Sequence, residues 1–333
     1  MSSTGRTPKL ALRLDVSIGE PAADDLRDSV SANTWRAYRS DLADFDAWCK
    51  SKRRRWSKPE SVAAYFRELE TAGAAYATIE RRKTAIAKLV EAEAVIGTAE
   101  TIEDPTKHPK VTVTLKAIRR RIGTDQDRAT PLTADRLIQV LLAIDETSLA
   151  GQRDIALLLT GWYGAFRRSE LSQMRRPHLK IDDHGVGIEV PRSKTAQDHS
   201  VWVPILRQAS SRWDPVAAVE RWLAELDERG LDEAAGIWLH VTKGDTFASK
   251  ARPISGDAIN NIVGRRVLSA GLEGAAGYSA HSLRSGFVTE AKNRGIDEAD
   301  IMKHSRHKSL EMMRLYDRTS GWWNRNATSG LAL

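Results

Sequence analysis

The segment His307-Lys-Ser-Leu-Glu-Met-Met-Arg-Leu-Tyr316 lies near the end of this 333-residue chain, and the interpretation of the rest depends on it. Its apolar residues recur at three- and four-residue steps, which predicts an amphipathic helix over residues 309–317. An isolated tyrosine on such a helix is usually an ordinary packing residue. A tyrosine can also attack phosphorus and form a covalent intermediate. Three motifs upstream decide between these two interpretations.

The upstream motifs supply cations that suit a phosphodiester. They are Phe166-Arg167-Arg168-Ser169-Glu170-Leu171, then Lys194 between β-like runs at 186–190 and 201–205, and His281-Ser-Leu-Arg284. Arginine forks match phosphate oxygens two at a time and keep their charge. The i,i+3 spacing of His281 and Arg284 places both on one side of a first helical turn, where an anion is favoured. No metal-binding carboxylate cluster accompanies them, so neither a metal nor another cofactor is expected.

In this order and at this spacing, the motifs resemble the tyrosine recombinase (phage integrase) family, in particular its Cre- and Xer-like members. The resemblance covers roughly residues 130–318. The family motif Arg-x-Ser-Glu-Leu corresponds to residues 167–171, so the resemblance implies that Arg167, and not its neighbour Arg168, is a catalytic arginine. Glu170 would orient Arg167 from three residues away.

The resemblance also implies roles for the other motif residues. Arg284 would complete a two-arginine clamp on the scissile phosphate, and His281 would act as an acid, a base or a hydrogen-bond donor. Lys194 would protonate the leaving 5′ oxygen. Tyr316 is the implied nucleophile.

His307 lies nine residues before the tyrosine, where the family commonly has histidine or tryptophan, often within Gly-His-x-Ser. Here the sequence is Arg306-His307-Lys308-Ser309, and the missing glycine puts the local turn in question. His304 is the competing candidate, twelve residues before the tyrosine. Spacing favours His307.

The activity implied by the resemblance is site-specific recombination by two transesterifications. Attack by Tyr316 leaves a 3′-phosphotyrosyl link and a free 5′ hydroxyl, and a 5′ hydroxyl of the partner duplex then attacks that link. The ester conserves the bond energy, so neither ATP nor a metal is required. The implied assembly is a homotetramer on double-stranded DNA, with accessory DNA-bending proteins as further candidate partners.

Two alternatives remain open at this point. A type IB topoisomerase uses similar chemistry but relaxes supercoils without a specific site or a synapse. A DNA-binding regulator could carry the catalytic set as a vestige. The sequence also leaves the target DNA undefined, and with it the choice between integration, excision, inversion and dimer resolution.

The charge of the chain is unevenly distributed. Its net charge is +7, with −2 on residues 1–49, +7 on residues 50–128 and +2 on residues 129–333. A concentrated basic region favours a polyanionic partner. Cys49 is the only cysteine, which excludes an intramolecular disulfide and fits a reducing compartment. Because neither a signal peptide nor a run of about 18 apolar residues is found, a cytoplasmic, nucleoid-associated protein without a membrane partner is expected.

Helical periodicity predicts a mainly α-helical protein with two domains. A flexible arm (1–30) precedes a helical domain (31–123), which the resemblance implies is the SAM-like core-binding domain, and a linker (124–131). Residues 132–318 are expected to form a mixed α+β catalytic domain with a small antiparallel sheet, with residues 237–240 as a further candidate strand. The tail, 319–333, contains Trp322 and Trp323, which either pack on their own domain or dock on a neighbouring protomer.

Three basic clusters in the helical domain are the candidate contacts to the DNA backbone. The alternative is that they are solvated helix faces. The middle cluster is expected to face outward from its helix. The candidates are Arg53, Arg54, Arg55, Arg81, Arg82, Lys83, Arg119, Arg120 and Arg121.

Overall fold

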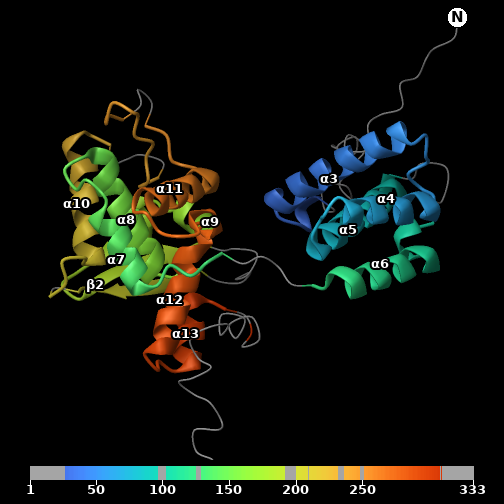
Figure 1. Cartoon of the computed structure of the whole chain (residues 1–333). Coiled ribbons are helices and arrows are strands. Elements are labelled where there is room, and N and C mark those ends of the chain that lie inside the picture. The colour runs from blue at the N-terminus through green and yellow to red at the C-terminus, as the bar shows by residue number, and fades with distance from the viewer. Residues whose placement is uncertain are drawn as a thin grey trace, which may run out of the picture. The chain divides into compact units, whose positions relative to one another are not determined.

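The computed structural model describes residues 27–96, 103–124, 129–191, 200–208, 210–231, 236–247, 251–307 and 309. The chain divides into two compact units, residues 1–127 and residues 128–333 (Figure 1). Each unit is built around its own hydrophobic core. No helix in the described ranges is long and apolar enough to cross a lipid bilayer.

The first unit contains the helices α3 (Ala32–Ser51), α4 (Pro59–Thr71), α5 (Tyr76–Ile96) and α6 (Pro109–Ile122). Local sequence explains where they begin and end. The Ser31 hydroxyl accepts a hydrogen bond from the Thr34 amide and so caps α3. Proline occupies the first turn of both α4 and α6, where its missing N–H costs nothing. Gly123, at φ 72°, ends α6.

The core of the first unit is formed by the predicted apolar faces of these helices. Its most deeply buried members come from all four helices, and the rings of Phe45 and Tyr65 lie 4.8 Å apart between centroids. Fully or almost fully buried side chains include Leu42, Phe45, Phe66, Ile79, Ile86, Leu89 and Ile118. The three-to-four-residue apolar spacing was therefore a sound guide to this core.

The second unit has seven α-helices and one sheet within its described residues. The helices are α7 (Ala134–Leu142), α8 (Leu149–Tyr163), α9 (Arg168–Ser172), α10 (Pro215–Glu228), α11 (Gly256–Ser269), α12 (His281–Asn293) and α13 (Glu298–Ser305). The strands β1 (Leu179–Ile181), β2 (Gly185–Val190) and β3 (Val201–Leu206) form an antiparallel sheet in the order β1-β2-β3. The predicted mainly helical fold with a small antiparallel sheet is confirmed.

The sheet is held in register by its buried face. Val186 pairs with Ile205 and Ile188 pairs with Val203, and all four side chains are buried. The expected strand over residues 237–240 is wrong, because this segment contributes only an isolated bridge between Leu239 and Pro253. It is nevertheless part of the core, which explains its apolar, strand-like sequence.

Helix α8 is the buried helix of this unit, and small residues let its neighbours approach it. A Cβ added to Gly161 on α8 would lie 2.7 Å from Leu283 Cδ1 on α12. A Cβ added to Gly286 on α12 would lie 1.9 Å from the Leu132 carbonyl oxygen, which also accepts a hydrogen bond from Trp162 Nε1 at 2.8 Å. Close packing of α12 on α8 places the start of α12 beside the end of α8.

Candidate catalytic site

Four of the six predicted catalytic residues belong to described segments. Arg167 is the N-cap of α9, His281 and Arg284 lie in the first turn of α12, and His307 follows α13. Lys194 and Tyr316 fall outside the described residues. The described site is therefore assembled from the ends of α8, α9, α12 and α13.

A sharp bend at residues 164–166, directly after α8, links these segments. Ala165 adopts φ 47°, in the left-handed region, and a Cβ added to Gly164 would lie 2.0 Å from the ring of Phe166. The Ala165 carbonyl accepts a hydrogen bond from Arg284 Nη1 at 2.7 Å. The bend thus provides the acceptor that orients Arg284, whose side chain is almost completely buried.

Glu170 joins two arginines from distant parts of the sequence. Its Oε1 accepts from Arg167 Nη1 at 2.7 Å, and its Oε2 accepts from both the Arg167 amide and Arg306 Nη2 at 2.9 Å. Burial acts to raise the pKa of the Glu170 carboxyl, but Arg306 and the amide and guanidinium of Arg167 outweigh it and lower the pKa below its usual value. Glu170 is therefore ionised at neutral pH.

Arg306 stands where the family commonly has glycine, and the backbone keeps a glycine-like conformation there. Its φ of 59° and ψ of 43° form the left-handed C-cap of α13. The turn questioned at the sequence level is thus present, formed by an arginine. The guanidinium lies 4.9 Å from the centroid of the Phe166 ring, and the carbonyl of Arg306 accepts from Arg167 Nη2 at 3.2 Å. Sequence reasoning assigned Arg306 no role, although the departure from the family pattern marked the position.

His307 is buried and surrounded by cations. Its Nδ1 lies 2.6 Å from the Ser305 hydroxyl, which fixes the orientation of the ring. Burial lowers the pKa of His307 to about 3, with further lowering by Arg284, Arg167, His281 and Arg306. The imidazole is therefore neutral at pH 7 and lies within the field of the same arginines that could bind a phosphate.

The competing histidine, His304, has a different environment. Its Nε2 is 2.7 Å from the Tyr163 carbonyl oxygen at the end of α8, and its ring stacks on Phe287 at 4.9 Å between centroids. Burial is the main cause that lowers its pKa. These contacts give His304 a packing role and leave His307 as the better candidate for the site.

His281 differs from the buried residues of the site because its side chain is exposed, although Arg284 one turn later is 1% exposed. The Ser279 hydroxyl accepts from the His281 amide, and the Asn260 side chain accepts from the Ala280 amide, so α11 helps to fix the start of α12. The pair therefore spans the site from its interior to its solvent-facing rim.

The middle basic cluster of the first unit is less available to DNA than its sequence suggests. Arg81 forms a bidentate pair with the buried Asp41 at 2.8 and 2.9 Å, and Arg82 donates to Asp44 and packs on Tyr65. The expectation that the middle cluster faces outward is therefore wrong for Arg82, whose side chain is only 19% exposed.

The other two basic clusters are more accessible. Arg53, Arg54 and Arg55 are exposed in the segment after α3, and Arg119 and Arg120 are exposed on α6. Arg121 is exposed as well, but its guanidinium is taken up by a bidentate pair with Glu70 at 2.6 and 2.7 Å. The loop after α3 and the outer face of α6 thus present the most accessible of the predicted DNA-binding arginines.

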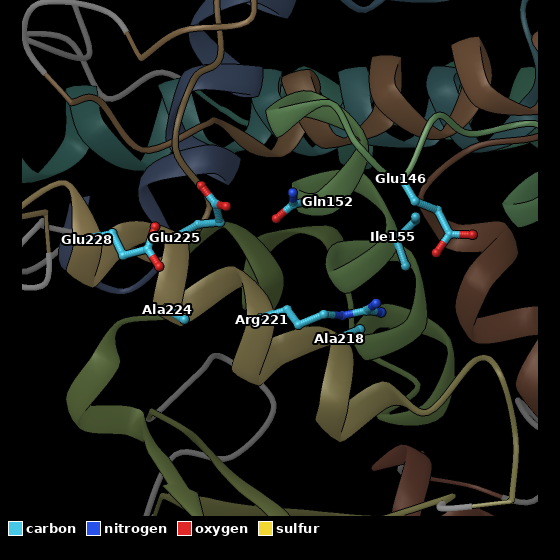
Figure 2. Close-up of a pocket in the computed structure, with 8 residues that line it drawn as sticks. All are labelled: Glu146, Gln152, Ile155, Ala218, Arg221, Ala224, Glu225 and Glu228. Atoms are coloured by element: carbon cyan, nitrogen blue, oxygen red, sulfur yellow. The ribbon is translucent and has the colours of Figure 1, made fainter.

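A cavity of about 390 Å³ between α8 and α10 is separate from these residues (Figure 2). Glu225 and Glu228 on α10 and Glu146 before α8 line it, with Arg221 among them. Within the described ranges, no group of three or more histidine, cysteine or acidic side chains is arranged to hold a metal ion.

Comparison with known proteins places this geometry in a family. Residues 130–320 match the phage integrase family, and residues 25–92 match the N-terminal SAM-like domain of phage integrases. The integrase/recombinase xerD homolog of Selenomonas ruminantium is 32% identical over 294 residues, which cover 87% of this chain and 83% of that protein. A tyrosine recombinase of Synechococcus elongatus is 28% identical over 312 residues, covering 88% of this chain and 86% of that protein.

Solved structures show the same fold at low sequence identity. The XerH site-specific recombinase bound to a palindromic difH substrate is 17% identical, with a TM-score of 0.61 over 89% of this chain and 79% of that chain. The lambda integrase (75–356) dimer bound to a COC′ core site is 16% identical, with a TM-score of 0.60 over 92% and 93%. The arginine and histidine motifs, the fold and these relatives agree: the chain belongs to the phage integrase family and is a tyrosine-type site-specific recombinase.

Proposed function

We propose that this recombinase cleaves duplex DNA through a 3′-phosphotyrosyl intermediate in which Tyr316 is the nucleophile. The observation that supports this most directly is the convergence of Arg167, Arg284 and His307, from three separate segments, through Glu170 and the 164–166 bend. Two guanidinium groups held in a partly buried site would stabilise the charge that develops on the phosphate oxygens during attack.

The remaining residues would complete the reaction. Lys194 would protonate the leaving 5′ oxygen, and His281 at the rim would donate a hydrogen bond or exchange a proton with the phosphate. His307, neutral at pH 7, would contact the phosphate without adding a charge. The second step reverses the first, with a 5′ hydroxyl of the partner duplex as the attacking group.

The proposed organisation follows the boundaries expected from the sequence. Residues 31–123 would bind DNA as the core-binding domain, using the exposed arginines after α3 and on α6 for backbone contacts. Residues 132–318 would form the catalytic domain. The lambda integrase tetramer bound to a Holliday junction, with a TM-score of 0.59 to this chain, supports a tetrameric synapse as the proposed assembly. We place this reaction at the nucleoid, in the cytoplasm.

Covalent trapping tests this proposal. The protein and its Tyr316→Phe variant are incubated with labelled duplexes that span the DNA flanking its own gene, in the presence of EDTA. An SDS-resistant protein–DNA adduct that forms with the wild type and not with the variant is expected. An adduct that persists in Tyr316→Phe would contradict the assignment of the nucleophile, and an adduct that EDTA abolishes would contradict the metal-free mechanism.

A further inference from the structure

Arg306 contacts Glu170 on α9, beside Arg167, and the 164–166 bend, whose Ala165 carbonyl also accepts from Arg284. We propose that Arg306 is a positioning residue: by sharing Glu170 with Arg167 and by bracing the 164–166 bend, whose Ala165 carbonyl accepts from Arg284, it sets the orientation of both arginines and the net charge beside the scissile phosphate. The inference rests on the proposed function and adds a residue to it.

The first step of the argument concerns the backbone. At φ 59° an L side chain is strained, whereas glycine is not. The arginine side chain offsets this strain with contacts that glycine cannot make. It stacks on Phe166, donates to the carbonyls of Gly164 and Ala165 at 3.2 Å, and pairs with Glu170 at 2.9 Å. The side chain is 11% exposed, so these contacts are largely shielded from water.

The second step concerns charge. Glu170 is 7% exposed and carries one negative charge between two guanidinium groups. If Arg167 were its only partner, the pair would be neutral and the carboxylate would draw Arg167 away from an incoming anion. With Arg306 as a second partner, the three groups keep a net positive charge. Because the Arg167 side chain is 29% exposed, an anion can reach it.

The third step concerns Arg284. The same Ala165 carbonyl oxygen accepts from Arg284 Nη1 at 2.7 Å and from Arg306 Nη2 at 3.2 Å. Arg306 therefore holds in place the acceptor that orients Arg284. A single side chain thus acts on both arginines, on one through a shared carboxylate and on the other through a shared carbonyl.

Single-turnover cleavage of the duplex identified by covalent trapping tests this inference. Arg306→Gly suits the backbone, so a defect reports the loss of the side chain. We expect its maximal cleavage rate to fall by about 10- to 100-fold, by analogy with the removal of partners that orient metal ligands. The DNA concentration that gives half of the maximal rate should change by less than about threefold. Arg306→Lys should recover part of the rate, because an ammonium can still pair with Glu170.

Chemical rescue separates positioning from general stability. Guanidinium chloride at non-denaturing concentrations, with ionic strength matched by sodium chloride, should raise the cleavage rate of Arg306→Gly and leave the wild type unchanged. Arg229→Ala is the matched control, because Arg229 pairs with Glu225 on α10 away from the site. This variant should cleave at the wild-type rate with or without guanidinium.

The outcomes separate a failure of the proposed function from a failure of the positioning role of Arg306. Absence of an adduct with the wild type would overturn the proposed function and this inference with it. If the wild type is active, three results would each overturn the positioning role. They are an unchanged rate in Arg306→Gly, a defect confined to DNA affinity, and a defect that neither lysine nor guanidinium restores. If Arg306→Gly does not fold, Arg306→Lys decides: an unchanged maximal rate would overturn the inference, and a reduced rate with unchanged half-saturation would support it.

Discussion

The arginines of the basic clusters in the first unit and those of the candidate catalytic site in the second differ in how their charge is balanced. In the basic clusters of the first unit, each arginine that forms an ion pair is matched by a carboxylate. Arg121 pairs with Glu70. Arg81 and Arg82 are balanced by the two carboxylates of Asp41 and Asp44. In the second unit, two arginines share the single carboxylate of Glu170, and Arg284 is oriented by a backbone carbonyl. Matched pairs leave little charge for an external anion, whereas the shared carboxylate leaves an excess. A run of arginines in a sequence therefore predicts a DNA contact only when the carboxylates that pair with these arginines are known.

The largest effect is expected at the buried end of the site. Arg284→Ala removes a guanidinium that is 1% exposed and aimed by the Ala165 carbonyl. We expect the cleavage rate to fall by about 100- to 1,000-fold, as for the loss of one preorganised donor to a developing oxyanion. The measurement is single-turnover adduct formation at saturating DNA. A defect below about tenfold would show that Arg284 does not act on the reacting phosphate.

A smaller effect is expected when the shared carboxylate is neutralised. Glu170→Gln keeps the size of the side chain but leaves Arg167 and Arg306 as adjacent cations without a counter-charge. We expect the cleavage rate to fall by about 10- to 100-fold because Arg167 loses its fixed orientation. Cleavage kinetics and thermal melting of the same preparation separate this loss from unfolding. Wild-type kinetics in Glu170→Gln would contradict the role of the shared carboxylate.

The pH dependence of stability tests whether His307 lies in a buried, cationic environment. Burial, with the nearby arginines, lowers the pKa of His307 from its ordinary 6.5 to about 3. The unfolded chain therefore binds a proton at higher pH than the folded chain does. The neutral, buried His307 therefore contributes to the free energy of unfolding fully above about pH 6.5, and this contribution is lost as pH falls toward about 3. Thermal melts across this window should show a steeper decline for the wild type than for His307→Gln, and parallel curves would contradict the assignment.

The smallest effect is expected on the salt dependence of DNA affinity, for which two neighbouring arginines on α6 are compared. Arg120 is exposed, whereas Arg121 pairs with Glu70. Arg120→Ala should reduce the slope of log affinity against log salt concentration by about one, the loss of one phosphate contact. Arg121→Ala should change this slope less and should instead lower the melting temperature. Binding isotherms at several salt concentrations measure both, and equal slopes for the two variants would show that carboxylate pairing does not decide DNA contact.

Sequence reasoning reached the fold and part of the site for identifiable physical reasons. Apolar periodicity marks buried helix faces directly, so the longer helices were predictable, and short β-like runs predicted β2 and β3. The five-residue helix α9 buries only Leu171 and shows no such periodicity. The strand β1 was not, because three residues are too short to show an alternation. The segment at 237–240 was mistaken for a strand because buried, irregular backbone can carry the same apolar residues.

The sequence did not reveal which carboxylates the arginines contact. Arg81 and Arg82 bind carboxylates on α3, about 40 residues earlier, and no local pattern links the two segments. The contact between Arg306 and Glu170 joins residues 136 positions apart. The i,i+3 contact between Arg167 and Glu170, in contrast, follows from helical spacing, and it is present.

The most direct test of the central account replaces one non-bridging oxygen of the scissile phosphate with a methyl group, which removes the charge that the arginines are proposed to neutralise. Cleavage rates of the wild type and of Arg167→Ala are compared on the normal and the methylphosphonate duplex. If Arg167 acts on the phosphate charge, the defect of Arg167→Ala on the normal duplex should shrink by at least about tenfold on the neutral one. An equal defect on both duplexes would contradict the account and would assign Arg167 to folding or to DNA binding.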